Sequence, residues 1–156
     1  CDPVSTSKAT KLSGLLGHFH AMKPNALEAE ALTGVTIHDE KSLELAAKKL
    51  LDTGLEQVFI SLGADGLLCA GQDGMLRLPS YSADVVSATG SGDAMMGAII
   101  WAHLQGEDLE GACAAGLAVA AICTESASTV NPNLTAEAVR QRMAEAGATG
   151  KVLSAN

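Results

Sequence analysis

The sequence is short of aromatic residues and of positive charge. Only four of its 156 residues are aromatic, and 10 Lys and Arg stand against 18 Asp and Glu, a formal net charge of −8. Nucleic-acid binding needs clustered basic residues, so we expect no nucleic-acid partner. Hydrophobic residues make up 47% of the chain and charged residues only 18%. This composition excludes intrinsic disorder, because disordered chains combine low hydrophobicity with high net charge.

Long apolar runs and paired cysteines are lacking as well. The longest uncharged run, residues 111–124, is shorter than the roughly 20 residues that span a bilayer, so we expect no membrane contact. The cysteines show no C-x-x-C spacing, so we expect reduced thiols in a cytoplasmic protein rather than a disulfide scaffold or a zinc site. The chain begins with Cys1 instead of Met. Together with the apolar composition, this suggests a piece of a larger molecule.

Apolar periodicity predicts helices that alternate with strands. Residues 39–51 have the spacing of an amphipathic helix, and residues 58–62 form an apolar run typical of a buried parallel strand. Residues 66–70 and 75–78 flank a glycine-rich hairpin signal. The other predicted elements are helices at 8–18, 26–32, 92–105, 109–126 and 134–146 and strands at 20–23 and 84–87. This order favours an α/β layered fold in one domain or one part of a domain.

The most informative segment, residues 88–93, reads Ala-Thr-Gly-Ser-Gly-Asp and leads into a predicted helix. Since Gly90 and Gly92 have no Cβ atom, backbone N–H groups can point at a ligand there, and the start of the helix adds its positive dipole end. The turn therefore suits a phosphate or an oxygen that gains charge. Met95 stands where a dinucleotide fingerprint needs its third glycine, and no Walker loop occurs.

Asp93 lies next to this turn, and its residue type allows two roles. A carboxylate placed there can act as the general base that takes a proton from a hydroxyl close to an arriving phosphoryl group. Alternatively, it only caps the helix or complements the helix dipole. Local sequence leaves both open.

Asn25 and Glu28 form a second motif, at the start of the helix predicted from residue 26. A spacing of three residues puts both side chains on one helical face. An amide and a carboxylate can together hold a hydrated Mg²⁺ through its waters. The alternative is a capping box, with Asn25 at the N-cap and Glu28 reaching back to it.

The third motif is Ser-Leu-Gly-Ala-Asp-Gly at residues 61–66, directly after the predicted buried strand. Gly63 and Gly66 would let a ligand approach the backbone where the strand ends, as in open α/β sheets. A tight turn into the next strand explains the same glycines.

In their order along the chain, these motifs resemble the C-terminal half of the ribokinase-like (PfkB-type) carbohydrate and nucleoside kinases. They read Lys-Pro-Asn-x-x-Glu-Ala at 23–29, Ser-Leu-Gly-x-x-Gly at 61–66 and Thr-Gly-Ser-Gly-Asp at 89–93. The resemblance covers nearly the whole chain and implies a three-layer α/β/α fold with a mostly parallel sheet. Residues 1–156 would be its C-terminal ATP-binding and catalytic portion, without the N-terminal half and lid. Residues 2–5 with Lys8, residues 23–30 and residues 127–134 look closest to the pseudouridine kinase branch.

The resemblance also implies catalytic roles. Asp93 would be the base that activates the acceptor hydroxyl, and the backbone N–H groups of Gly90, Ser91 and Gly92 would form the anion hole for the γ-phosphoryl group of ATP. Where the family often has Asp, this sequence has Ser87, a departure that leaves a K⁺ site in doubt.

The resemblance places the nucleotide and its metal as well. Asn25 and Glu28 would position Mg²⁺, partly through water. The nucleotide phosphates and ribose would be lined by Ser61, Gly63 and Gly66. Residues 120–131 would border adenine, with Asn131 among the nucleotide-binding residues.

The activity implied is ATP-dependent phosphorylation of a hydroxymethyl group on a small nucleoside or sugar, with pseudouridine the first candidate. Ribose, fructose and adenosine are alternatives, because most acceptor contacts in this family come from the half that this chain lacks. A non-catalytic nucleotide-binding remnant is the alternative outside enzymes. We expect a homodimer at full length and no useful turnover from the isolated chain.

Overall fold

The computed structural model describes residues 1–72, 74–146 and 151–153, the last three without their side chains. Contacts divide the chain into two compact units. The first contains Cys1–Gly63, Leu67–Arg77 and the end of the chain from Val152, and the second contains Ala64–Gly66 and Leu78–Lys151. We describe each unit by itself.

A five-stranded sheet runs through the first unit in the order β1-β2-β3-β4-β5. The strands are β1 (Ala21–Met22), β2 (Gln57–Ser61), β3 (Leu67–Gly71), β4 (Gly74–Leu78) and β5 (Lys151–Leu153). β1 pairs with β2 in parallel, and β2 pairs with β3 antiparallel. The sheet is therefore mixed, where the sequence predicted a mostly parallel one. The physical reason is the hairpin: the two residues between β3 and β4 are too few for the crossover that parallel neighbours need.

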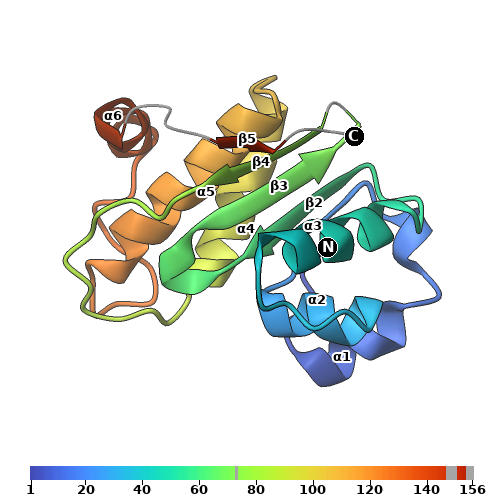
Figure 1. Cartoon of the computed structure of the whole chain (residues 1–156). Helices are drawn as coiled ribbons and strands as arrows, with labels where there is room; N and C mark the ends of the chain where they lie inside the picture. Colours follow the sequence, from blue (N-terminus) through green and yellow to red (C-terminus); the bar gives the residue numbers. More distant parts are fainter. Residues whose placement is uncertain (73, 147–150, 154–156) are drawn as a thin grey trace. The chain divides into compact units, whose positions relative to one another are not determined.

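The helices of this unit are α1 (Thr6–Leu12), the 3₁₀ helix η1 (Leu16–His18), α2 (Ala26–Thr33) and α3 (Glu40–Leu51). α3 packs on β2 and β3, α2 packs on β2 and on α3, and α1 packs on α2 (Figure 1). α3 begins with a capping box in which Asp39 accepts from the Ser42 backbone N–H, and its apolar face is buried. The predicted helix at 8–18 is interrupted at residues 13–15, where Gly14 favours a turn.

Helices dominate the second unit. α4 (Ser91–Leu104) and α5 (Leu109–Thr124) lie side by side, and α6 (Ala136–Ala146) packs on α5 (Figure 1). The two long helices approach closely at Gly116, where an added Cβ would lie 3.1 Å from Met95 Cγ. The short 3₁₀ helix η2 (Gly63–Asp65) joins the two units along the chain.

One predicted strand is absent, and one chemical expectation is wrong. Residues 84–87 form no strand, because the N–H groups of Val86 and Ser87 both donate to the carbonyl oxygen of Thr124 at the end of α5. Two of the four cysteines, Cys69 and Cys113, are disulfide-bonded, which corrects the expectation of reduced thiols there. Cys1 and Cys123 are free.

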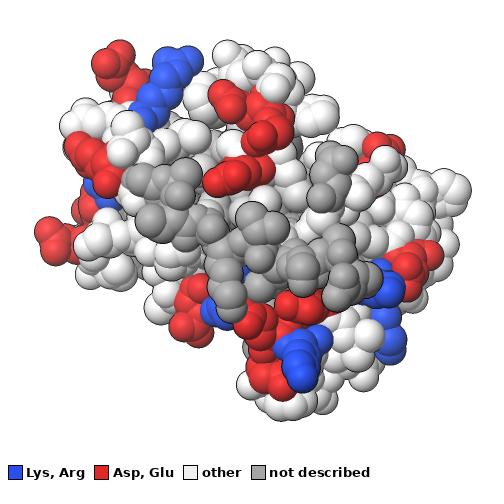
Figure 2. Space-filling view, turned by 45° about the horizontal axis from the view of Figure 1, so that its top comes forward, with Lys and Arg blue, Asp and Glu red and all other residues white. Residues whose placement is uncertain are grey.

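Charged side chains of both signs lie on the face shown in Figure 2. There, Lys and Arg side chains are interspersed with Asp and Glu and form no broad basic area. Among the described residues, no helix combines the length and the apolar character needed to cross a membrane.

Candidate active site

Asp93 is the third residue of α4, and its side chain is exposed. Within the described residues, its carboxylate makes no hydrogen bond and no ion pair. The N-cap residue is Gly90, which has no side chain, so Asp93 does not cap the helix by a side-chain bond. The carboxylate is therefore available to a ligand, and its place in the first turn also complements the dipole of α4.

Gly90 shapes the turn ahead of Asp93. Its φ of +82° lies in the left-handed region that side chains rarely adopt. An added Cβ would also lie 2.8 Å from Thr129 Cγ2 and 3.0 Å from the Thr129 carbonyl oxygen. Both conformation and space thus require glycine here.

The backbone donors of the turn are not equivalent. The Ser91 N–H points to the Ala88 carbonyl oxygen at 3.3 Å, which the Ser91 hydroxyl also contacts at 2.8 Å. Gly92 and Asp93 are the second and third residues of α4, so their N–H groups have no carbonyl partner inside the helix. Of the predicted anion hole, Gly92 offers an unengaged donor, whereas Ser91 is partly engaged by its own turn.

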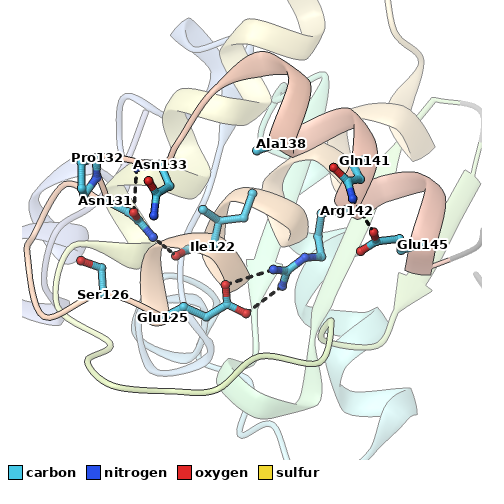
Figure 3. Close-up of a pocket in the computed structure, with 10 residues that line it drawn as sticks. All are labelled: Ile122, Glu125, Ser126, Asn131, Pro132, Asn133, Ala138, Gln141, Arg142 and Glu145. Atoms are coloured by element: carbon cyan, nitrogen blue, oxygen red, sulfur yellow. Dashed lines mark hydrogen bonds and ion pairs between the residues drawn. The ribbon is translucent and has the colours of Figure 1, made fainter.

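The loop after α5 supports this turn, and Asn131 fixes the loop. The Asn131 side chain is buried, donates to the Ile122 carbonyl oxygen at 2.6 Å and accepts from the Asn133 N–H at 2.9 Å (Figure 3). Both polar ends of this predicted nucleotide-binding residue are therefore used within the protein. Asn131 holds the loop that carries Thr129 against Gly90.

In the first unit, the structure brings together Asn25, Glu28 and Ser61. Asn25 is the N-cap of α2 and also forms a parallel bridge with Ser61, next to the Ser61 N–H bond to the Pro24 carbonyl oxygen at 3.0 Å. Two motifs that lie far apart in sequence thus meet at neighbouring strand ends.

Asn25 and Glu28 form the capping box that the sequence left as an alternative. Asn25 Oδ1 accepts from the Glu28 N–H, and Glu28 Oε2 accepts from the Asn25 N–H, both at 2.9 Å. Glu28 is only 4% exposed, and within the described residues no Lys or Arg pairs with it. A buried carboxylate with so little compensation is costly unless a cation lies near.

Lys23, the first residue of the Lys-Pro-Asn motif, is a buried cation to which the sequence assigned no role of its own. Its Nζ atom lies 3.0 Å from Asp2 Oδ2. Asp2 Oδ1 also accepts from the N–H of Val4, whose φ of +69° is unusual for a β-branched residue. Both ends of the Asp2 carboxylate are thus used to order the start of the chain.

Glycine is needed at residues 63 and 66 for different structural reasons. Gly63 has a φ of +60° with open space around it. Gly66 has a φ of +93°, and an added Cβ would overlap the Leu78 carbonyl oxygen and lie 2.7 Å from Pro79 C. Packing at the end of the hairpin therefore explains why residue 66 is glycine. At residue 63 the backbone conformation favours glycine, and the space beside its Cα atom is open.

Two cavities of the second unit are lined by predicted site residues. One, of about 560 Å³, has Gly90 and Asp93 in its wall, and its lining is mostly apolar side chains of α4, α5, α6 and the loop between the last two. The other, of about 460 Å³, is lined by the polar residues Glu125, Asn131 and Arg142 among others (Figure 3). Residues of the stretch 120–131 line both cavities.

Arg142 is a residue of this region that sequence reasoning missed, whereas its partner Glu125 falls within the predicted stretch 120–131. They lie 17 positions apart on different elements and belong to no motif. The one sequence signal that could have indicated Arg142 is the hydrophobic pattern of α6, which shows which side of the helix faces the protein. Within the described residues, no cluster of three or more His, Cys, Asp or Glu side chains could hold a metal ion.

Comparison with known proteins gives one family. Residues 1–136 match the family model described as pfkB family carbohydrate kinase. An uncharacterized sugar kinase of Escherichia coli, YeiI, is 31% identical over 139 residues, which cover 87% of this chain and 38% of YeiI. The 1-phosphofructokinase of Escherichia coli is 33% identical and covers 90% and 46%. The pseudouridine kinase of Escherichia coli is 35% identical over 98 residues, which cover 61% of this chain and 31% of that enzyme.

Solved structures agree on the fold. A Clostridium perfringens protein provisionally described as a sugar kinase matches with a TM-score of 0.88 and 29% identity over 92% of this chain and 46% of its own. Arabidopsis thaliana ribokinase, solved with ribose and ATP, matches with a TM-score of 0.76 and 25% identity over 84% and 43%. The ribokinase-like α/β fold expected from sequence is confirmed. The chain spans less than half the length of these proteins.

Proposed function

Because this chain belongs to the pfkB family of carbohydrate kinases, we propose that residues 1–156 form the ATP-binding and catalytic portion of a ribokinase-like kinase domain. The enzyme would transfer the γ-phosphoryl group of ATP to a hydroxyl of a small sugar or nucleoside. One observation carries the proposal: Asp93 presents an exposed, unengaged carboxylate in the first turn of α4, directly after the left-handed Gly90.

Asp93 would act as the general base. Its carboxylate accepts the proton of the acceptor hydroxyl as that oxygen forms a bond to the γ-phosphorus, while the bond to the bridging oxygen of ADP breaks. Negative charge on the transferred group would be met by the N–H groups of Gly90, Ser91 and Gly92 and by the dipole of α4. The exposed position of Asp93 supports this role, because an acceptor must reach it.

Magnesium fits the donor chemistry of Asn25 and Glu28 with one restriction. Mg²⁺ prefers oxygen ligands and keeps several waters, and the buried Glu28 carboxylate lacks a cationic partner among the described residues. Asn25 Oδ1 and Glu28 Oε2 already accept backbone hydrogen bonds, so contact through water suits them better than direct ligation. A bound Mg²⁺ would neutralise charge on the nucleotide phosphates.

The rest of the nucleotide would contact two further groups. Ser61, Gly63 and Gly66 would line its phosphates and ribose, as proposed from the sequence. Adenine would lie along the segment 120–131. The exposed side chains of Val85, Val86 and Val130 support this location, since they are 63–73% exposed and an aromatic ring could cover them.

Replacing the base tests the mechanism directly. In the protein at its natural length, Asp93→Asn should lower kcat by about 10²- to 10⁴-fold and leave ATP affinity nearly unchanged. Asp52→Asn, which neutralises an exposed carboxylate at the end of α3, is the matched control and should keep normal kcat. Near-normal turnover by Asp93→Asn would refute the assignment.

The acceptor is the finer part of the proposal, and pseudouridine, converted to pseudouridine 5'-phosphate, is the first candidate. The motifs at 2–5 and 127–134 support it, but 1-phosphofructokinase and pseudouridine kinase are related at similar identity. Initial rates with pseudouridine, ribose, fructose, a fructose phosphate and adenosine would rank the acceptors. A higher kcat/KM for any of the others would replace pseudouridine.

A non-catalytic nucleotide-binding role is the second candidate. It would require ATP·Mg²⁺ binding by calorimetry without transfer to any acceptor of the panel. The exposed Asp93 favours the enzyme, because within the described residues its carboxylate makes no hydrogen bond or ion pair and is open to an acceptor. We further propose that the natural-length protein is a cytoplasmic homodimer, which ultracentrifugation and fractionation would test.

A further inference from the structure

Arg142 joins three separate segments of the second unit. Its Nη1 atom donates to the Ser82 carbonyl oxygen at 3.1 Å and to Glu125 Oε1 at 3.0 Å, and its Nη2 atom donates to Glu125 Oε2 at 3.0 Å. The guanidinium of α6 thus holds the residue after α5 and the loop that follows β4. We call this set, Arg142, Glu125 and Ser82, the Arg142 bridge.

The bridge stands between two cavities. The cavity of about 460 Å³ and a neighbouring one of about 260 Å³ share Glu125, Arg142 and Glu145 in their walls. Figure 3 shows the Glu125 and Arg142 side chains facing each other, with the fork of the guanidinium on the carboxylate. A change in this pair therefore alters both cavities.

The segments that the bridge joins also lead to the Gly90 turn. The Thr124 carbonyl oxygen at the end of α5 accepts hydrogen bonds from the N–H groups of Val86 and Ser87. Val86 lies four residues before Gly90 in the chain. On the other side, the loop after Glu125 runs to Thr129, which packs against Gly90. The bridge sits where these two chain segments leave the end of α5.

The chemistry of the pair argues against a direct role on phosphate. Both terminal nitrogens of Arg142 are engaged by protein oxygens, and the bidentate form fixes the plane of the guanidinium. The side chains of Arg142 and Glu125 are only 23% and 29% exposed, so water and salt screen the pair less than a surface pair. This geometry serves to hold segments in place.

We propose that Arg142 is a positioning residue for nucleotide binding. Through Glu125 and Ser82 it keeps the segment 82–87 and the loop 125–131 at a fixed separation, so that a nucleotide finds both in place. The inference rests on the proposed function, which places adenine along residues 120–131 beside the exposed Val85 and Val86. Arg142 touches neither the reacting atoms nor Asp93, and its loss should change affinity rather than the transfer step.

Steady-state kinetics of the natural-length protein test this. Arg142→Gln should raise the KM for ATP by about tenfold, as expected for the loss of one net charge-assisted hydrogen bond, and should leave kcat and the acceptor KM within about twofold. ADP affinity should fall by the same factor, since the bridge acts away from the γ-phosphate. Arg140→Gln, on the same helix but stacked on Trp101 at 5.5 Å, is the matched control and should leave the KM for ATP unchanged.

A double-mutant cycle tests the role of Glu125. If Arg142 acts through it, Glu125→Gln should raise the KM for ATP too, and Glu125→Gln with Arg142→Gln should be no worse than Arg142→Gln alone. Effects that multiply would overturn the proposal, as would an unchanged KM or an equal loss in kcat. Should Arg142→Gln fail to fold, Arg142→Lys decides, because it keeps the charge and loses the bidentate fork.

Hydrogen exchange separates failure of this inference from failure of the proposed function. Whether or not the protein is a kinase, Arg142→Gln should speed amide exchange at Val86 and Ser87, while Arg140→Gln should not. Faster exchange without any ATP binding by the parent protein would refute the kinase proposal and, with it, the nucleotide role of the bridge. Unchanged exchange would refute the positioning role itself.

Discussion

At the scale of the residue, the turn before α4 needs a residue without a side chain at position 90 and presents a carboxylate at position 93. Gly90 must lack a side chain, since its φ is positive and Thr129 lies against it. Asp93 presents a side chain that the described protein does not use. The exposed N–H groups and the Asp93 carboxylate, which has no hydrogen bond among the described residues, both suit a ligand, and the charge of Asp93 also complements the dipole of α4.

Gly90→Ala should therefore destabilise the second unit. A left-handed alanine costs about 1–2 kcal/mol before the overlap with Thr129 is counted. Gly97→Ala, in the same helix with nothing within 4 Å of the added Cβ, should instead stabilise it by up to about 1 kcal/mol. Urea denaturation of both variants measures this. Thr129→Ser should recover part of the loss in Gly90→Ala, because it removes the Cγ2 atom at 2.8 Å.

Asp39 links a single residue to acid stability. Hydrogen bonds from the Ser42 side chain and backbone lower the pKa of Asp39. Because the pKa is lower in the folded state, the stabilisation is complete above the ordinary value near 3.8 and is lost as the pH falls through the folded value. Titration by NMR should show the Asp39 pKa moving back up in Ser42→Ala. An unchanged pKa would show that the Ser42 hydroxyl does not cause the shift.

At the scale of the element, the hairpin of β3 and β4 decides how the sheet is built. Its two-residue connection makes neighbours of strands that run in opposite directions, while β1 and β2 stay parallel. The parallel pair carries Asn25 and Ser61 at its carboxyl ends. Gly66 then lets the chain enter β3 beside the end of β4.

Comparison of Gly66→Ala with Gly63→Ala tests this account of the hairpin. Gly63→Ala should lower the free energy of unfolding by about 1–2 kcal/mol, the cost of a left-handed alanine in open space. Gly66→Ala should cost more or prevent folding, because its Cβ would overlap backbone at Leu78 and Pro79. Circular dichroism during urea denaturation gives both values. Equal midpoints would contradict the packing role of Gly66.

At the scale of the whole molecule, an excess of acidic groups governs solubility. The formal net charge of −8 keeps molecules apart at neutral pH, and it vanishes near the isoelectric point of about 4.8. Exposed apolar side chains such as Ile100 and Leu104 can then associate. We predict a solubility minimum close to that pH, measured by turbidity, and clear solutions at pH 7.5. A minimum far from pH 5 would contradict a charge-controlled surface.

The sequence by itself determined the motifs, most element positions and the family resemblance. Local physics is enough for these: Asn25 caps α2, the apolar run at 58–62 gives β2, and the glycines at 90 and 92 mark the start of α4. The same local signals could not choose between the capping box and a magnesium contact at Glu28, and the structure shows the box.

Only the tertiary structure decided which distant residues meet. Asn25 lies beside Ser61 because two strands pair, the expected strand at 84–87 is lost because Thr124 takes its N–H groups, and Arg142 reaches Glu125 because α6 packs on α5. No periodicity records such contacts, since they depend on chain segments far apart in sequence competing for the same donors and acceptors. The Arg142 bridge follows from that competition.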